Sequence, residues 1–500
     1  MTLITAPLLL TAFFPIIGFV IIMLLKPEQK ATIRWVALTT SLITFGFSIW
    51  LVSLFNPQVT TPQFEINNLW FGVGGIPIRF HMGVDGLNIL LVLLTSFLTP
   101  ISILSTWEAV KERVKGFMLF FLLLEIGMMG VFLSLDLVLF YVFWEFTLIP
   151  MYFLIGMWGG DRRIYAAIKF FLYTMAGSVL MLLAILYIGW TAGTFDLHQL
   201  ISAKNGFAGV ELWLFLAFAL AFAIKVPLWP LHSWLPDAHV EAPTAGSVIL
   251  AGVLLKMGTY GFLRFNLMLF PETTIRLAPW MAALAVIGIL YGAVVAYVQK
   301  DVKKLVAYSS ISHLGFVILG LFALNQQGIA GGILQMVNHG LSTGALFLIV
   351  GMLYERRHTR VMAEYGGIWK VMPVLGSLTL IVTLSSLGLP GLNGFVGEFT
   401  LLVGAFGSQA LGSPVFAGLA TLGVILAAIY LLHMFEKVFL GGVTNTENQN
   451  LKDINFREIL MLGVILVMIF WIGLYPKPFF DLINPSVEQM VNTLQIAVIP

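Results

Sequence analysis

Apolar runs of about 20 residues, the length that spans ~30 Å of hydrocarbon as an α-helix, recur along almost the whole chain and constrain its fold most strongly. Short polar segments separate the runs. Only 10% of the residues are charged, against about 25% in an ordinary soluble domain. The sequence therefore predicts an all-α polytopic membrane protein in which residues 1–500 form a single membrane domain.

About fourteen transmembrane helices are expected, two of them discontinuous. The predicted ranges are 4–25, 33–55, 84–106, 116–134, 136–157, 164–189, 211–229, 243–269, 277–299, 305–323, 328–353, 371–404, 413–435 and 457–475. Range 371–404 is too long for one simple span and contains Pro390, Gly391 and Gly394, so we expect a break in it. Pro227 and Pro230 predict a second break, beside Lys225.

The two broken helices suggest an internal repeat. Each is the fourth helix of a set of five, the sets being residues 116–269 and 277–435. Because five is odd, the second set would be inserted upside down, which is a common transporter architecture. Three helices within residues 1–106 would precede the two inverted repeats, and one helix at 457–475 would follow them.

The distribution of Lys and Arg predicts the orientation. Nineteen of the 26 fall on one side of the predicted membrane and two, Lys225 and Lys256, fall inside spans. The other side has five, namely Arg79, Lys204, Arg264, Arg276 and Lys477. Because basic loops stay in the cytoplasm, both termini are expected on the periplasmic side of a bacterial plasma membrane, with lipid around the helices.

Several functions are excluded. No GxxxxGK[ST] motif is present, and Gly72, Gly74 and Gly75 do not open a predicted helix. The absence of cysteine excludes thiolate metal sites and cysteine-ligated iron–sulfur clusters. The net charge of +2 is explained by topology and does not indicate nucleic acid as a partner. We therefore expect no cofactor and no metal in this chain, and energy must come from an ion gradient or from partner subunits.

Glu145 and Lys225 are predicted at membrane depth, where an ionisable group costs roughly 2.5 to 3.5 kcal/mol even on the lenient scale. Burial disfavours the charged form of each side chain, whereas close approach of the two side chains favours the charged forms again. A pKa shift of ~3 units corresponds to roughly 4 kcal/mol. This free energy is comparable with the ~2.3 kcal/mol that a membrane potential of 100 mV supplies for each charge moved. The pair fits a proton pump, and the alternative is a static salt bridge.

Further ionisable residues lie in later spans. Lys256 is too deep in its span to reach an interface, and His313 and His339 lie in polar runs that suit a proton relay between lysines. Glu398 follows the second break. The alternative role for each histidine is structural, as a hydrogen-bonded residue that packs between helices.

A second group is assigned to access or support. Glu125 is an embedded carboxyl whose participation stays open, and Tyr308 could carry protons only through ordered water. His232 and His239 lie with Asp237 and Glu241 in a proline-rich segment. Proton access or helix capping is favoured over a metal cluster there.

Five segments carry a family resemblance. They are Lys225 through Lys256, Phe143-Trp144-Glu145, Tyr308-Ser-Ser-Ile-Ser-His313, Asn338-His339-Gly340, and Gly388 through Glu398. Together they resemble the antiporter-like subunits of respiratory complex I over nearly the whole chain. Two of the three large subunits of that family have lysine in the last broken helix, and this chain resembles the third, which has glutamate.

The resemblance implies a proton channel driven by NADH:quinone electron transfer in other subunits. FMN, iron–sulfur clusters and quinone would then belong to partner subunits, which include neighbouring antiporter-like subunits and peripheral ones. It also implies Glu145 and Lys225 as the coupled pair, Lys256 and the histidines as the central connection, and Glu398 as the exit-side group.

Two other functions stay open. A subunit of a multi-subunit Mrp-type Na⁺/H⁺ antiporter would run on a gradient without a redox partner. A structural scaffold is disfavoured by the buried charges at Glu145, Lys225, Lys256 and Glu398. Neither the electron donor, NADH or ferredoxin, nor the choice of proton over sodium is fixed by these residues.

Overall fold

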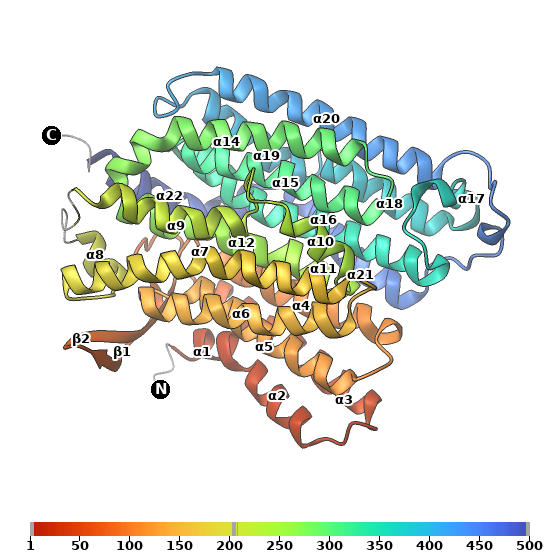
Figure 1. The fold of residues 1–500 in the computed structure, drawn as a ribbon, viewed down its shortest axis with the longest axis horizontal. Helices are drawn as coiled ribbons and strands as arrows, with labels where there is room; N and C mark the ends of the chain where they lie inside the picture. The colour runs from red at the N-terminus through yellow and green to blue at the C-terminus, as the bar shows by residue number, and fades with distance from the viewer. Residues whose placement is uncertain (1–4, 203–206, 208, 497–500) are drawn as a thin grey trace.

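The computed structural model describes residues 5–202, 207 and 209–496, and its helices lie side by side along one common direction (Figure 1). Within these residues, eleven helices are long and apolar enough to cross a membrane, or twelve if one bent pair counts as a span. The eleven are α3 (Lys30–Leu54), α4 (Ile89–Ala109), α5 (Val114–Leu133), α6 (Leu137–Trp158), α7 (Arg163–Ala192), the composite helix Thr244–Leu269, α14 (Pro271–Tyr297), α15 (Val302–Phe322), α16 (Gln326–Arg357), α20 (Val415–Phe439) and α21 (Phe456–Leu474). Helices thus occupy the predicted ranges, and the chain is mostly helical.

The first predicted span is bent rather than straight. It consists of α1 (Ala6–Phe13) and α2 (Pro15–Leu24), which meet at 40°. Pro15 at the junction lacks a backbone N–H and its ring crowds the preceding turn, which accounts for the bend.

Both predicted breaks are present. The helix α9 (Glu211–Lys225) ends at Lys225, and α10 (Trp234–Glu241) begins after a non-helical segment that contains Pro227 and Pro230. The second break separates α18 (Pro373–Ser386) from α19 (Asn393–Phe406). Gly388 (φ +83°) and Gly391 (φ +92°) allow the second break, because glycine adopts this left-handed region without a Cβ clash.

The composite helix and α16 form the centre of the bundle, and both are fully buried in their apolar windows. The composite helix contains α11 (Thr244–Ile249), α12 (Leu255–Gly261) and α13 (Leu267–Leu269), joined by π-helical segments at Leu250–Leu254 and Phe262–Asn266. The π-helical segments stand on either side of Lys256, and such segments occur often at functional sites.

One prediction needs correction, because the chain is not entirely α-helical. Strands β1 (Gln63–Val73) and β2 (Ile76–Val84) form an antiparallel hairpin that turns at Gly74 and Gly75. Its register is irregular, so the alternation of polar and apolar residues is weak and gave no strand signal. Further helices lie wholly or almost wholly outside the predicted spans, namely α8 (Leu197–Ser202), α10 (Trp234–Glu241), α17 (Ile368–Val371), α22 (Lys477–Ile496) and the 3₁₀ turns at Met362–Glu364 and Thr446–Asn448.

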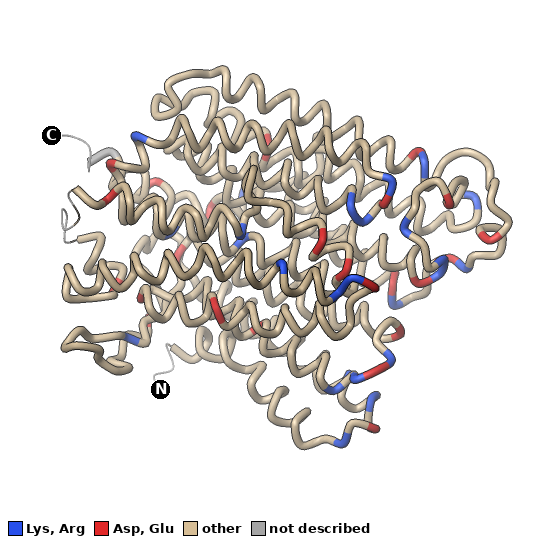
Figure 2. The backbone as a smooth tube through the Cα atoms, viewed as in Figure 1, with Lys and Arg blue, Asp and Glu red and all other residues tan. Residues whose placement is uncertain are grey.

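Charged residues gather at the ends of the bundle, and the blue Lys and Arg positions lie mainly at one end (Figure 2). We call this end, which holds the α2–α3 connection and α17, the basic end. The hairpin and α8 lie at the opposite end (Figure 1). Lys204, one of the five basic residues predicted on that side, lies outside the described residues.

A buried ion pair ties the composite helix to the segment before α4. The Nη1 and Nη2 atoms of Arg264 each donate to an oxygen of Asp85 at 2.6 Å, and the two side chains are 5% and 7% exposed. We expect Asp85→Ala to destabilise the fold by about 3 to 5 kcal/mol, because it leaves a buried guanidinium unpaired. The readout is the amount of assembled complex on native gels and its midpoint of thermal aggregation.

The matched control replaces both partners, as Asp85→Leu with Arg264→Met. An apolar pair of similar volume needs no ionic partner, so this double variant should regain most of the lost stability. A single variant as stable as the wild type would contradict the prediction.

Candidate functional site

Lys225 is the last residue of α9 and is completely buried. Its Nζ atom has no hydrogen-bond partner among the described residues. It lies 5.4 Å from the ring centroids of both Trp144 and Phe170, at a distance typical of cation–π contacts. The helix ends here because Pro227 follows two residues later and lacks a backbone N–H, so the ammonium group stands beside irregular backbone.

Glu145 is half-buried on α6, next to Trp144. Tyr141, Ser178 and Lys225 are the polar neighbours that influence its carboxylate electrostatically. No ion pair within 4.0 Å joins Glu145 and Lys225 in the described part of the chain, where Nζ of Lys225 and Oε1 of Glu145 both lack hydrogen-bond partners. Glu145 and Lys225 are therefore neighbours that do not form an ion pair in this structure.

Lys256 lies on α12, fully buried at the centre of the bundle. Its Nζ atom is 2.7 Å from Nδ1 of His339 on α16 and also bonds the carbonyl oxygen of Ala251. The π-helical segment at Leu250–Leu254 leaves that carbonyl free of a regular α-helical bond. The sequence predicted both residues at membrane depth, and the structure brings them into direct contact.

His313 on α15 contacts Glu398 on α19. Nδ1 of His313 is 2.8 Å from Oε1 of Glu398, and both side chains are about 5% exposed or less. The same carboxylate oxygen accepts a hydrogen bond from Nε2 of Gln335 at 2.9 Å. On the other side of the ring, the hydroxyl of Tyr430 lies 3.1 Å from Nε2 of His313.

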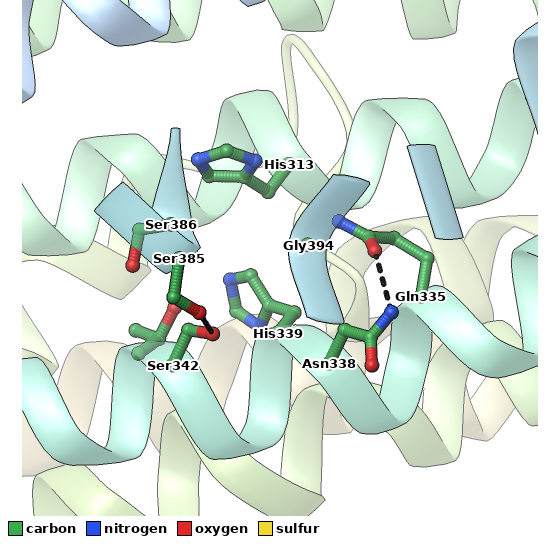
Figure 3. A pocket seen from close by; sticks show the side chains of 9 residues that line it. His313, Gln335, Asn338, His339, Ser342, Ser385, Ser386 and Gly394 are labelled. Carbon is green, nitrogen blue, oxygen red and sulfur yellow. Dashed lines mark hydrogen bonds between the residues drawn. The ribbon is translucent and has the colours of Figure 1, made fainter. Parts of the chain in front are cut away.

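The two histidines face each other across a small cavity, with ring centroids 6.0 Å apart (Figure 3). The cavity is lined by polar side chains from α16 and α18, including Asn338, Ser342 and Ser385, and has room for about one water molecule. A water there would complete a path from Lys256 through His339 and His313 to Glu398. We call these four residues the central array.

Residues around the central array include several that sequence reasoning did not single out. Gln335 and Asn338 are hydrogen-bonded to each other at 3.3 Å, and Asn338 also donates to the carbonyl oxygen of Asn393 at 2.7 Å, at the start of α19. Gln335 is one helical turn before His339, so helical periodicity could have placed it on the same face. Tyr430 had no sequence signal, because only folding brings α20 to α15.

The remaining predicted residues lie apart from the central array. Glu125 on α5 is completely buried, and neither carboxylate oxygen has a hydrogen-bond partner within the described residues. The rings of His232 and Tyr308 lie 6.4 Å apart, and Tyr291 is 5.0 Å from His232. These three aromatic residues form a separate group beside the first break.

His239 is fully buried and stacks on Phe347 at 4.5 Å. Both ring nitrogens lack hydrogen-bond partners among the described residues, and the ring interacts electrostatically with Lys303 and Lys256. The neighbouring acidic residues have other partners, since Asp237 pairs with Lys169 at 2.7 Å and Glu241 accepts from the backbone of Arg162. No group of three or more metal-ligating side chains is found in the described part of the chain.

A cavity of about 790 Å³ opens at the basic end. Its lining includes Glu241, Lys303 and Tyr354, together with other charged residues from the loops there. Nζ of Lys303 donates to the carbonyl oxygen of Ala242 at 2.6 Å. His239 is thus influenced electrostatically both by Lys303, which lines this cavity, and by Lys256 in the central array.

Comparisons with known proteins agree on one family. The family described as "NADH:quinone oxidoreductase/Mrp antiporter, TM" matches residues 134–427. The chain is 46% identical over 478 residues to NADH-quinone oxidoreductase subunit M of Rhodobacter capsulatus, which covers 93% of this chain and 92% of that protein.

Solved structures have the same fold. A chain of respiratory complex I from Thermus thermophilus with bound NADH superimposes with a TM-score of 0.88 at 33% identity, covering 97% of this chain and 99% of that one. A chain of the Mrp complex from Dietzia sp. has a TM-score of 0.85 at 20% identity and full coverage of both chains, which is a likeness of fold alone.

Proposed function

This chain belongs to the NADH-quinone oxidoreductase subunit M family, and on that premise we propose that it moves protons across a membrane through its buried Glu, Lys and His residues. It is a proton-translocating membrane subunit of complex I, and other subunits of that complex are its partners. The observation that best supports the proposed route is the contact series Lys256–His339 and His313–Glu398, with one water-sized cavity between the histidines.

The proposed route has two parts. Glu145 and Lys225 form the driving pair, because their separation or approach changes the charge that each can hold in a medium of low dielectric constant. The central array then carries the proton toward Glu398, since a neutral imidazole can accept a proton at one nitrogen and release one from the other. At an effective dielectric constant of 20, a charge change 4 Å away is worth about 4 kcal/mol, enough to bias each step.

Intake is assigned to the cavity at the basic end. Lys303 in its wall and the unpartnered His239 behind it provide titratable groups between the solution and Lys256. His232 and Tyr308 are placed beside the Lys225 break as support, and the role of Glu125 stays open.

The arrangement in the membrane follows from the same proposal. Residues 116–269 and 277–435 are taken as inverted repeats, since a broken helix stands fourth in each. Three helices precede them, one spanning helix at 457–475 follows, and fourteen spans place both termini on the periplasmic side of a bacterial plasma membrane. FMN, iron–sulfur clusters and quinone are assigned to partner subunits.

A test of the function uses the purified complex reconstituted in liposomes. We expect electron transfer to quinone to move protons across the liposome membrane without added sodium, and the preparation to contain flavin and iron–sulfur subunits. A complex without redox cofactors that exchanges Na⁺ for H⁺ along an imposed gradient would instead support the Mrp-type alternative. That alternative is weaker, because the likeness to the Mrp chain is 20% in identity against 33% for the complex I chain.

A further inference from the structure

His313 of the central array has a hydrogen-bond partner on each ring nitrogen. Its Nδ1 atom is 2.8 Å from Oε1 of Glu398, and its Nε2 atom is 3.1 Å from the hydroxyl oxygen of Tyr430. The same Oε1 atom accepts from Nε2 of Gln335 at 2.9 Å. While Glu398 is ionised its oxygens only accept, so the neutral ring carries its proton on Nδ1, and Nε2 accepts from the tyrosine O–H. The hydroxyl of Tyr430 therefore sets which nitrogen of His313 holds the proton.

Tyr430 reaches the array from a helix at the edge of the bundle. Its helix α20 lies along one side of the molecule (Figure 1), and only 33% of its most apolar window is buried. Tyr430 itself is completely buried, and Ser309 of α15 is another polar neighbour of its hydroxyl. Packing alone would accept phenylalanine, which has nearly the same size and no polar atom. The hydroxyl thus adds a polar contact with His313 that packing does not require.

The two occupied ring nitrogens constrain how a proton enters His313. The imidazole lines the water-sized cavity that it shares with His339, whose Nε2 atom has no hydrogen-bond partner among the described residues (Figure 3). A proton that passes through a water in this cavity needs a free nitrogen on His313, because an imidazole N–H cannot accept a second proton. Hydrogen bonds to a charged group are stronger than neutral ones. Nε2, which is held by a neutral hydroxyl, is therefore the nitrogen that opens more easily.

The proposed repeats place Tyr430 in a position that agrees with a role in proton transfer. The helix α20 is the fifth helix of the second repeat, and the composite helix is the fifth of the first. Lys256 of the composite helix contacts His339, and Tyr430 of α20 contacts His313. Each repeat thus brings one polar side chain from its fifth helix against one of the two histidines.

We propose that Tyr430 is a gating residue whose hydroxyl closes Nε2 of His313 to the cavity and opens it for each proton. While the hydroxyl is bound there, no proton enters from the cavity and none returns to it. When the hydroxyl turns away, a cavity water takes its place. Nε2 then gains a proton and Nδ1 releases one to Glu398. The proton left on Nε2 returns to Nδ1 by tautomer exchange before the next cycle, and no electron moves. This inference rests on the proposed function, since a gate needs a proton route on which to act.

The test compares Tyr430→Phe with the wild-type complex in liposomes. Phenylalanine removes only the hydroxyl, so Nε2 stays open to the cavity in both directions. We expect electron transfer to quinone to continue and fewer protons to be pumped per electron pair. Without substrate, the proton leak down an imposed pH gradient should rise roughly threefold to tenfold, which corresponds to the loss of one neutral hydrogen bond.

Two further variants serve as controls. Replacing Tyr430 by 3,5-difluorotyrosine keeps the hydroxyl and makes it a stronger donor, so the leak should stay at the wild-type level while pumping slows. Tyr365→Phe removes another buried hydroxyl, which donates to the carbonyl oxygen of Thr359 at 2.7 Å at the basic end. This variant should leave both the leak and the number of protons per electron pair unchanged.

The double variant Tyr430→Phe with Glu398→Gln separates a gate from loosened packing. A leak through the open gate must pass the carboxyl group of Glu398, so it should vanish in the double variant. A leak that persists there would overturn the gate, because it would run between loosened helices. Wild-type leak and pumping in Tyr430→Phe would overturn it too.

If Tyr430→Phe does not assemble, the difluorotyrosine variant decides the question, and unchanged pumping by it would contradict the gate. Loss of pumping in Lys225→Ala together with wild-type leak and coupling in Tyr430→Phe would sink only this inference and leave the proposed function standing.

Discussion

Lys225→Ala is expected to abolish proton pumping and most quinone reduction while the complex still assembles. Both rates should fall by at least about tenfold, which corresponds to roughly 1.4 kcal/mol. The buried Nζ atom of Lys225 is the protonatable group at the first break, and alanine leaves that position without one. Glu145→Ala should have the same effect, because it removes the partner that lets the ammonium group charge. Quinone reduction is measured as turnover in proteoliposomes and proton pumping as the pH change inside them. Native gels show whether the complex has assembled.

Lys225→Arg separates a proton carrier from a static ion pair. Arginine keeps the positive charge but does not release its proton in proteins. A carrier role therefore predicts that the arginine variant pumps no better than the alanine variant. Wild-type pumping in Lys225→Arg would mean that the charge serves helix packing alone, and wild-type activity in Lys225→Ala would remove the proposed driving pair.

Glu398→Gln is expected to stop proton transfer through the central array. The amide is nearly the same size, so it can keep hydrogen bonds to His313 and Gln335, but it cannot take up a proton. Because the packing is conserved, assembly should be normal and the loss should fall on pumping. We expect the pumping rate to fall by at least about tenfold, which is modest for a group that transfers protons directly.

The control for this variant is Glu398→Asp, which retains a carboxyl group at a slightly longer distance from His313. It should pump more slowly than the wild type and faster than Glu398→Gln. Equal pumping by the glutamine variant and the wild type would show that the proton does not pass through this carboxylate.

The broken helices show how much of the fold could be predicted from local chemistry. Pro227 lacks a backbone N–H, and Gly388 and Gly391 adopt positive φ, so the sequence marks where regular hydrogen bonding stops. The β-hairpin at 63–84 was not predicted, since its irregular register weakens the alternation of polar and apolar residues. The bend between α1 and α2 depends on one proline inside an otherwise apolar run.

The candidate site divides in the same way. Lys256, His313, His339 and Glu398 were predicted because a charged or polar group at membrane depth is costly and visible in an apolar run. Their pairing was not visible, since the contacting residues are 83 and 85 positions apart in the chain. Tyr430 was not predicted, because a tyrosine within an apolar run carries little energetic penalty that a sequence can reveal, and its contact with His313 spans 117 positions of the chain.

By itself, the sequence determined that this chain spans a membrane many times, that its basic loops lie on one side, and that a few ionisable residues stand in hydrocarbon. These conclusions follow from transfer free energies, which depend on each segment alone. The tertiary structure decided which of those residues touch, that Glu145 and Lys225 are separated, and where the water-sized cavity lies. Contacts of this kind depend on how distant helices pack, and packing is a property of the whole bundle.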